Sequence, residues 1–185
     1  MFSLSRFVSD CISASDPADV SGSVARLRRV YKVVEEDAAG IRASIPNEGP
    51  DEVLLHEDDR CTIYIVRTPP GVLYAPHDHG MVAIVGVFEG AEANDFFTRA
   101  RSESLTLPRD STEVIREGCV TVLDADVVHA ISCEGSVRSQ ALHVYLGNLG
   151  AQDRSLFHPT TGAALPFTME NYFGTARPPQ PIPTG

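Results

Sequence analysis

The chain has 185 residues, a length typical of one domain and sufficient to bury a substantial core. Its formal net charge of −10 disfavours binding to the phosphate backbone of nucleic acids, which requires clustered lysine and arginine. No stretch is long and apolar enough for a signal peptide or a membrane span, so we expect a cytoplasmic protein without a membrane partner.

The first predicted element is a helix within residues 1–50. Asp16-Pro17 has the form of an N-cap followed by a proline at the first helical position. Apolar residues then recur near helical spacing through residues 20–34, and the Pro- and Gly-containing stretch 46–50 ends the pattern. We expect residues 1–50 to form a helical segment that packs on the rest of the fold.

Short β-rich runs follow the helical segment. They cover residues 53–55, 61–67, 73–76, 82–88, 93–99, 105–107, 112–115, 120–123, 130–133 and 140–145. Turn sequences such as Pro69-Pro70-Gly71 separate them, and after residue 147 the periodicity fades. This pattern predicts an all-β barrel or sandwich of antiparallel strands over residues 51–173, followed by a Pro-rich tail over residues 174–185.

The sequence His77-Asp78-His79 is the first candidate site. On a strand, residues two apart project from the same face, so His77 and His79 can direct both imidazoles into one barrel interior. A third ligand must come from elsewhere, and His129 follows a turn-rich segment that begins at Gly118. Taken alone, such a pair is more often two surface or hydrogen-bonded histidines than a metal site, so the surrounding sequence decides between the two.

Two segments resemble the sequence boxes of the cupin superfamily. Residues 71–90, which contain both histidines of the pair, resemble the first box, and residues 118–129 resemble the second. The resemblance covers about residues 71–149 and implies a cupin double-stranded β-helix, or jelly-roll, barrel with N-terminal helices. It also implies one divalent metal ion, bound by His77, His79 and His129.

The departures from the cupin pattern indicate a particular branch. Cupins usually have a glutamate ligand four or five residues after the second histidine, where this chain has Ala83 and Ile84. A site of three imidazoles resembles the cysteine dioxygenase-like, or thiol dioxygenase, branch of cupins. Residues 89–97 also resemble a less characterised group of predicted metal-dependent double-stranded β-helix proteins related to that branch.

The run Ala141-Leu142-His143-Val144-Tyr145 resembles a relay of the same branch. In thiol dioxygenases a Ser-x-His-x-Tyr run forms hydrogen bonds beside the iron; here the histidine and the tyrosine match and the serine is absent. Strand alternation places Ala141, His143 and Tyr145 on one face. The resemblance implies that Tyr145, oriented by His143, acts in catalysis, and the alternative is an ordinary aromatic residue beside a core histidine.

The implied reaction adds both oxygen atoms of O2 to a small thiol and gives a sulfinate. Three neutral ligands leave the metal its full positive charge, which suits an anionic thiolate. The resemblance favours Fe(II), whereas zinc, nickel or another divalent metal can bind the same donors. The expected partners are therefore a small-molecule substrate and O2, and a homodimer is one of the oligomeric states that the sequence leaves open.

Thiol dioxygenases that act on cysteine also need an arginine for the substrate carboxylate. The candidates are Arg60, Arg67 and Arg99. Arg67 is favoured because its strand leads directly into the histidine pair through a short turn. For each of the three, the alternative is an arginine exposed to solvent.

Two other classes of function remain open. One is a non-catalytic cupin that binds a metal and a small ligand; His143 and Tyr145 argue against this class, and the missing serine argues for it. The other is a zinc-dependent hydrolase, which needs a carboxylate base near the metal. Asp78 is expected to face away from the two histidines, which disfavours the hydrolase.

The four cysteines form no Cys-x-x-Cys pair, and we expect free thiols in a reducing compartment. Cys61, Cys119 and Cys133 lie in or beside β-rich runs. They are therefore predicted to be small buried apolar residues that do not bind the metal.

Overall fold

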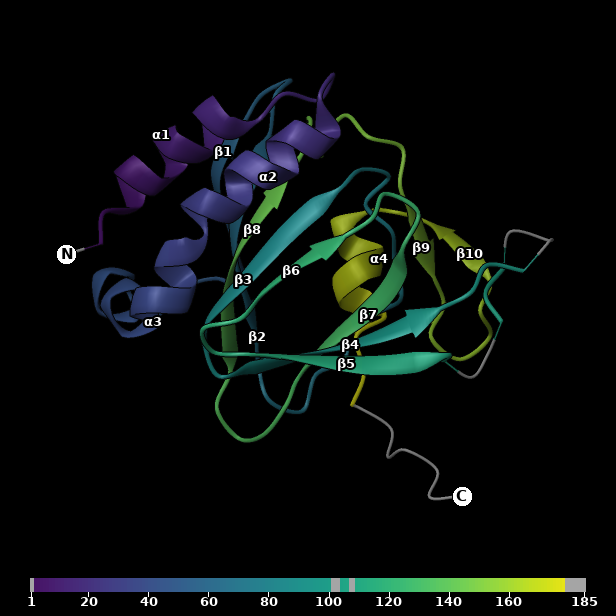
Figure 1. Cartoon of the computed structure of the whole chain (residues 1–185). Helices are drawn as coiled ribbons and strands as arrows, with labels where there is room; N and C mark the ends of the chain where they lie inside the picture. Colours follow the sequence, from purple (N-terminus) through teal and green to yellow (C-terminus); the bar gives the residue numbers. More distant parts are fainter. Residues whose placement is uncertain (1, 101–103, 107–108, 179–185) are drawn as a thin grey trace.

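The computed structural model describes residues 2–100, 104–106 and 109–178 and shows two facing β-sheets with helices outside them (Figure 1). The larger sheet has the strand order β1-β2-β8-β3-β6, the smaller has β5-β4-β7, and β10 pairs with β9. This arrangement is the cupin double-stranded β-helix barrel that the sequence predicted. The strands are β1 (Glu52–Glu57), β2 (Thr62–Thr68), β3 (Ala83–Glu89), β4 (Ala91–Phe97), β5 (Ser111–Arg116), β6 (Val120–Leu123), β7 (Val128–Cys133), β8 (Ser139–Tyr145), β9 (Ser155–Phe157) and β10 (Ala164–Pro166).

Helices pack on the outer face of the larger sheet (Figure 1). The prediction of one helix that begins at Asp16-Pro17 was wrong in its start and its extent. Asp19 is the N-cap of the second helix, because its carboxylate accepts a hydrogen bond from the backbone N–H of Gly22 over 3.1 Å. The helices are α1 (Leu4–Ala14), α2 (Val20–Val30) and α3 (Lys32–Ser44).

Tyr31, between α2 and α3, joins the helices to the sheet. Its side chain is completely buried, and its hydroxyl lies 3.1 Å from the Ile84 carbonyl oxygen and 3.0 Å from that of Leu142. Gly86 on β3 lies against the ring, where a Cβ atom would come within 2.7 Å of a ring carbon. The missing side chain of Gly86 therefore permits the close approach of helix and sheet.

Strands β2 and β8 are buried on both faces, so their side chains divide between two apolar layers. On β8, Leu142 and Val144 pack with the helices, whereas Ala141 and Tyr145 pack inside the barrel. The alternation of a β-strand places His143 on the interior face with them.

Two predicted strands are absent from the part of the chain that the structure describes. Residues 73–76 form irregular chain, in which Leu73 makes isolated bridges to Ser132 and Arg177, and Leu105 makes one such bridge to Arg99. Conversely, β9, β10 and a helix, α4 (Met169–Gly174), lie where the faded periodicity predicted no element. Residue 107 lies outside the described residues.

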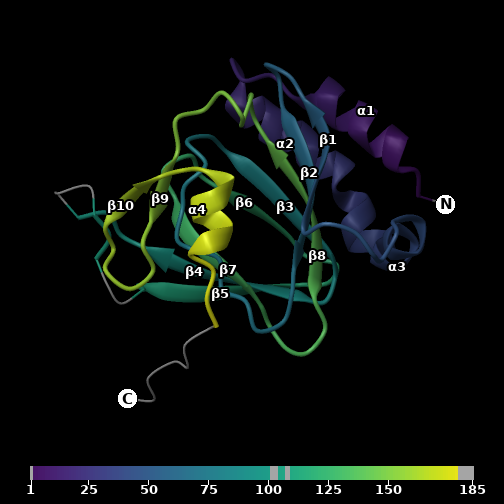
Figure 2. The same ribbon diagram turned by 180° about the vertical axis from the view of Figure 1, so that it is seen from behind.

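The segment after β10 is held on the barrel on the side away from α1, α2 and α3 (Figure 2). The ring of Tyr172 on α4 stacks on Tyr74 with centroids 5.0 Å apart. Arg177, inside the predicted tail, pairs with Leu73 through two backbone hydrogen bonds of 2.6 and 3.0 Å. The rest of that predicted tail, residues 179–185, lies outside the described residues.

All four cysteines are free thiols, as predicted. Cys11, Cys61 and Cys133 are buried, but Cys119 is exposed because it lies in the turn between β5 and β6, and its predicted burial was wrong. Among the described residues, no helix combines the length and the apolar character needed to cross a membrane.

Candidate metal centre

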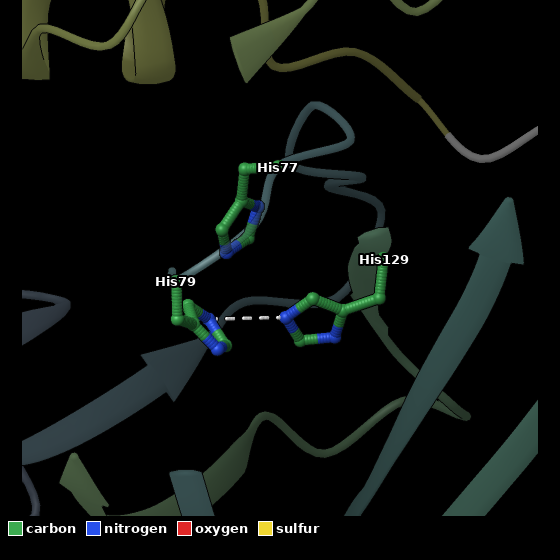
Figure 3. Close-up of side chains that lie close together, drawn as sticks. All are labelled: His77, His79 and His129. Atoms are coloured by element: carbon green, nitrogen blue, oxygen red, sulfur yellow. Dashed lines mark hydrogen bonds between the residues drawn. The ribbon is translucent and has the colours of Figure 1, made fainter. Parts of the chain in front are cut away.

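Three buried histidines meet inside the barrel (Figure 3). His77 and His129 face each other through two backbone hydrogen bonds of 2.9 Å, and His79 follows two residues later. His77 takes part in isolated bridges rather than in a regular strand, yet both histidines of the pair point into the interior. One ring nitrogen from each of the three lies within 4.8 Å of the other two, so the three predicted ligands come together.

Hydrogen bonds hold two of these rings so that the nitrogen without a hydrogen, Nε2, points toward the centre. His77 Nδ1 lies 2.9 Å from the Ala75 carbonyl oxygen, which only accepts, so Nδ1 carries the hydrogen and Nε2 keeps its lone pair. His129 Nδ1 is held in the same way, 2.6 Å from Asn94 Oδ1. Such partners fix the tautomer that a metal-binding histidine requires.

The protonation state of the rings also suits a cation. Burial lowers the pKa of His77 to about 4 and lowers the pKa values of His79 and His129 well below the ordinary value, with a further contribution from mutual repulsion. All three are therefore neutral ligands near pH 7. The Nε2 atoms of His79 and His129 lie only 3.2 Å apart, so one must carry a hydrogen unless a cation takes its place. These donors fit one divalent metal ion.

A second polar group lies beside the histidine cluster. His143 Nδ1 is 3.1 Å from the Tyr145 hydroxyl, and the Tyr145 ring centroid is 4.9 Å from that of His79. Both side chains are buried and line the same pocket as the three ligands. Burial lowers the pKa of His143 to about 3 and raises that of Tyr145, so both are neutral near pH 7. The alternation of β8 therefore brings the predicted pair to the pocket that the three histidines line.

The arginines that the sequence favoured do not line this pocket. Arg67 lies on β2 with Tyr64 and Val66 as pocket-lining neighbours, but alternation turns its own side chain to the other face. There its guanidinium donates to Gln140 Oε1 and to the carbonyl oxygens of Pro46 and Pro50. These hydrogen bonds leave Arg67 a structural role, contrary to the prediction that it binds substrate.

The other two candidates are also engaged elsewhere. The guanidinium of Arg60 donates to the Ser15 carbonyl oxygen, and Arg99 forms an ion pair with Asp78. Asp78 also accepts from the backbone N–H of Ser155, and it does not line the pocket. The expectation that Asp78 faces away from the histidine pair is thus confirmed.

Arg154 is a pocket residue that the sequence interpretation missed. Its guanidinium carbon lies 3.7 Å from the centroid of the Phe167 ring, and it makes no hydrogen bond or ion pair with any described residue. Glu52 on β1 lines the same pocket, and burial raises the pKa of its carboxyl group. Arg154 is the only lysine or arginine between residues 147 and 173, and this isolated charge was the one sequence feature that could have marked it as a candidate. No predicted strand or helix contained it, so the sequence did not place it near the histidines.

A smaller cluster lies in the hairpin between β1 and β2, where His56, Asp58 and Cys61 offer atoms within 4.8 Å of one another. Asp58 has a structural use there, because its Oδ1 accepts from the backbone N–H groups of Arg60 and Cys61, and its Oδ2 lies 3.1 Å from His56 Nε2. No cysteine lines the three-histidine pocket.

No protein-family model and no curated protein matches the sequence. Among solved structures, the chain is similar to a protein with a double-stranded β-helix domain from Klebsiella pneumoniae (13% identity over 63% of this chain and 87% of that chain, TM-score 0.47). It is also similar to a cupin superfamily protein from Desulfitobacterium hafniense (17% identity, 57% and 86%, TM-score 0.44). A third similar structure is a DMSP lyase from Ruegeria pomeroyi (18% identity, 56% and 46%, TM-score 0.43).

Proposed function

We propose that the chain is a metal-dependent cupin enzyme that oxidises a small anionic thiol with O2. The observation that supports this most strongly is the three-imidazole donor set beside the buried His143–Tyr145 pair. In the proposed reaction, a thiol and O2 give a sulfinic acid, so both oxygen atoms bond to sulfur and the S–H hydrogen remains in the product. Sulfur is oxidised by four electrons, and O2 accepts them.

His77, His79 and His129 would hold the metal. A ferrous ion there would supply positive charge for a thiolate and a redox-active centre for O2. Zinc fits the same donors but has no redox chemistry, so the choice of iron follows from the resemblance to thiol dioxygenases.

The chain's own residues would bind and orient the substrate. The Tyr145 hydroxyl offers a hydrogen bond at the pocket wall. The guanidinium of Arg154, which has no hydrogen bond or ion pair among the described residues, offers two parallel N–H donors to a carboxylate. The rings of Tyr64, Phe167 and Tyr172 form apolar walls that limit water around the reacting groups.

Oxygen uptake by anaerobically prepared, iron-loaded protein tests this proposal. The panel should contain small thiols with a carboxylate, with an amine, with both and with neither. We expect one O2 consumed per thiol lost and a product 32 mass units heavier, with carboxylated thiols preferred. Stoichiometric iron without thiol-dependent uptake would instead support a metal-binding cupin without turnover.

The zinc-loaded protein serves as the matched control, because zinc occupies the same donors without accepting electrons. We expect no oxygen uptake from it. Ester or amide hydrolysis by the zinc form, absent from the iron form, would support the hydrolase instead.

A further inference from the structure

A line of buried polar side chains extends from a metal ligand toward Tyr145. His129 contacts Asn94, and Asn94 Nδ2 donates to Glu92 Oε1 over 3.1 Å. At the other end His143 contacts Tyr145. The line has one gap, 3.9 Å wide, between Glu92 Oε2 and His143 Nε2.

Both atoms at the gap lack another partner. Among the described residues, neither Glu92 Oε2 nor His143 Nε2 has a hydrogen bond, and the two residues are 0% and 2% exposed. Leaving a buried polar atom without a hydrogen-bond partner destabilises the folded state. A shift of about 1 Å brings the two atoms to hydrogen-bond distance and satisfies both.

The strand that carries His143 does not supply this partner itself. Ala141 lies on the interior face of β8, where the resembled relay has its serine, and a methyl group cannot form the hydrogen bond. Glu92 reaches His143 from β4 in the facing sheet. The group that can form a hydrogen bond with His143 Nε2 therefore comes from another part of the fold.

We propose that Glu92 is the third member of the relay, a positioning residue that donates its Oε2 hydrogen to His143 Nε2. With Nε2 as acceptor, His143 carries its hydrogen on Nδ1 and donates it to the Tyr145 oxygen. The hydroxyl hydrogen of Tyr145 then remains free for a bound substrate. The inference rests on the proposed function in one respect: the proposed function names the bound substrate as the group that receives the Tyr145 hydrogen.

The surroundings of Glu92 favour the neutral acid that this arrangement requires. Complete burial raises its pKa from the ordinary 4.5 to about 7, although the hydrogen bond from Asn94 lowers it. An ionised Glu92 would reverse the relay: His143 would carry its hydrogen on Nε2, and Tyr145 would donate to Nδ1. Tyr145 would then present only lone pairs to the pocket.

The tautomer of His143 tests the proposal without any turnover. Long-range ¹H–¹⁵N correlation spectra of zinc-loaded protein at pH 6 identify which ring nitrogen carries the hydrogen. We expect the Nδ1–H form in the wild type and in Glu92→Gln, because the glutamine amide also donates an N–H to Nε2. The Nε2–H form in the wild type overturns the proposal, whatever the outcome of the thiol assays.

Turnover of the iron-loaded protein then distinguishes a positioning role from a merely structural one. Glu92→Met fills a similar volume but removes the donor, and we expect kcat per bound iron to fall about 10- to 100-fold with KM unchanged. Glu92→Gln should rescue kcat to within about threefold. Equal kcat per bound iron in the wild type and Glu92→Met would contradict the positioning role.

A double-mutant cycle with Tyr145→Phe shows whether Glu92 acts through the tyrosine. If it does, Glu92→Met adds little further loss to Tyr145→Phe, because the hydroxyl that Glu92 directs is already gone. Losses that multiply would show that Glu92 acts independently of Tyr145 and would overturn the proposal. A wild type that oxidises no thiol refutes the proposed function alone, since the tautomer spectra remain decisive for Glu92.

Discussion

His129 supplies the one donor of the candidate metal site that comes from β7, whereas His77 and His79 lie in one other segment. Replacing it with alanine leaves two imidazoles and removes the third donor. We predict that His129→Ala binds less than about one tenth of the metal bound by the wild type, measured by elemental analysis after dialysis. The fold should persist, as judged by circular dichroism.

His56→Ala is the matched control for this measurement, since His56 belongs to the hairpin cluster with Asp58 and Cys61. We expect this variant to retain the wild-type metal content. The opposite pattern, with metal retained in His129→Ala and lost in His56→Ala, would show that the metal binds in the hairpin cluster instead.

Arg154 provides the second prediction at the scale of single residues. A charged hydrogen bond to a bound carboxylate contributes about 1.5–3 kcal/mol, so Arg154→Gln should raise KM for a carboxylated thiol about 10- to 100-fold. Turnover of a thiol without a carboxylate should change little. Steady-state kinetics with a matched pair of thiols measures the difference.

Arg60→Gln is the control, because Arg60 is exposed and, among the described residues, its guanidinium donates only to the Ser15 carbonyl oxygen, away from the pocket. Its kinetics should match those of the wild type. If Arg154→Gln weakened both thiols of the pair equally, Arg154 would shape the pocket rather than bind the anion.

At the scale of elements, the contact between the helices and the sheet depends on Gly86. A Cβ atom there would lie 2.7 Å from the buried Tyr31 ring, so Gly86→Ala must displace the ring or bend the strand. Overpacking of this kind costs about 1–3 kcal/mol, and we predict that loss in the free energy of unfolding by urea.

Gly174→Ala offers a comparison, because a Cβ atom at that position meets no atom within 4 Å. We expect no loss of stability from it. Equal changes in the free energy of unfolding for the two substitutions would show that the contact with Tyr31 is not the cause of the loss in Gly86→Ala.

The strands were predictable where the residues on both faces are apolar, or where apolar and polar residues alternate regularly, as in β2, β3 and β8. Sequence periodicity failed where tertiary contacts replace local pattern. Residues 73–76 have β-rich composition but make only isolated bridges, and α4 is too short for its periodicity to be recognised. The helices α2 and α3 divide at Tyr31, where the sequence has no glycine or proline to signal a break.

The same distinction applies to the site. The three histidines come together as the resemblance to the cupin boxes implied, although His77 lies outside a regular strand, and the alternation of β8 places Tyr145 beside them. Arg154 and Glu92 were not predicted, because Arg154 reaches the pocket from a segment outside the recognised motifs and Glu92 approaches His143 from the facing sheet. Arg67 had the right strand but the wrong face, a difference of one residue in register.

At the scale of the whole molecule, the two faces of the large sheet have different uses. The helices α1, α2 and α3 cover the outer face (Figures 1 and 2). The polar groups of the site lie inside the barrel. Burial there keeps the histidines neutral and also disfavours the ionised form of Glu92. The stability of the metal-free fold should therefore depend on pH through both kinds of group.

For Glu92, the direction of this dependence follows from its raised pKa. The group is protonated in the folded state up to about pH 7, whereas an unfolded chain releases the proton near the ordinary 4.5. The folded state thus binds more protons between these values. Its stabilising contribution is complete below about pH 4.5 and is lost as pH rises through about 7, a change of about 3 kcal/mol.

The histidines have the opposite sign, because their lowered pKa values favour unfolding as pH falls, so the total stability does not isolate Glu92. The difference between the wild type and Glu92→Gln does, since the histidines are common to both. In metal-free protein unfolded by urea, the wild type should lose stability relative to Glu92→Gln between pH 5 and pH 8. A pH-independent difference would mean that Glu92 keeps the same charge when folded and unfolded, and a difference of opposite slope would mean that the fold stabilises its carboxylate.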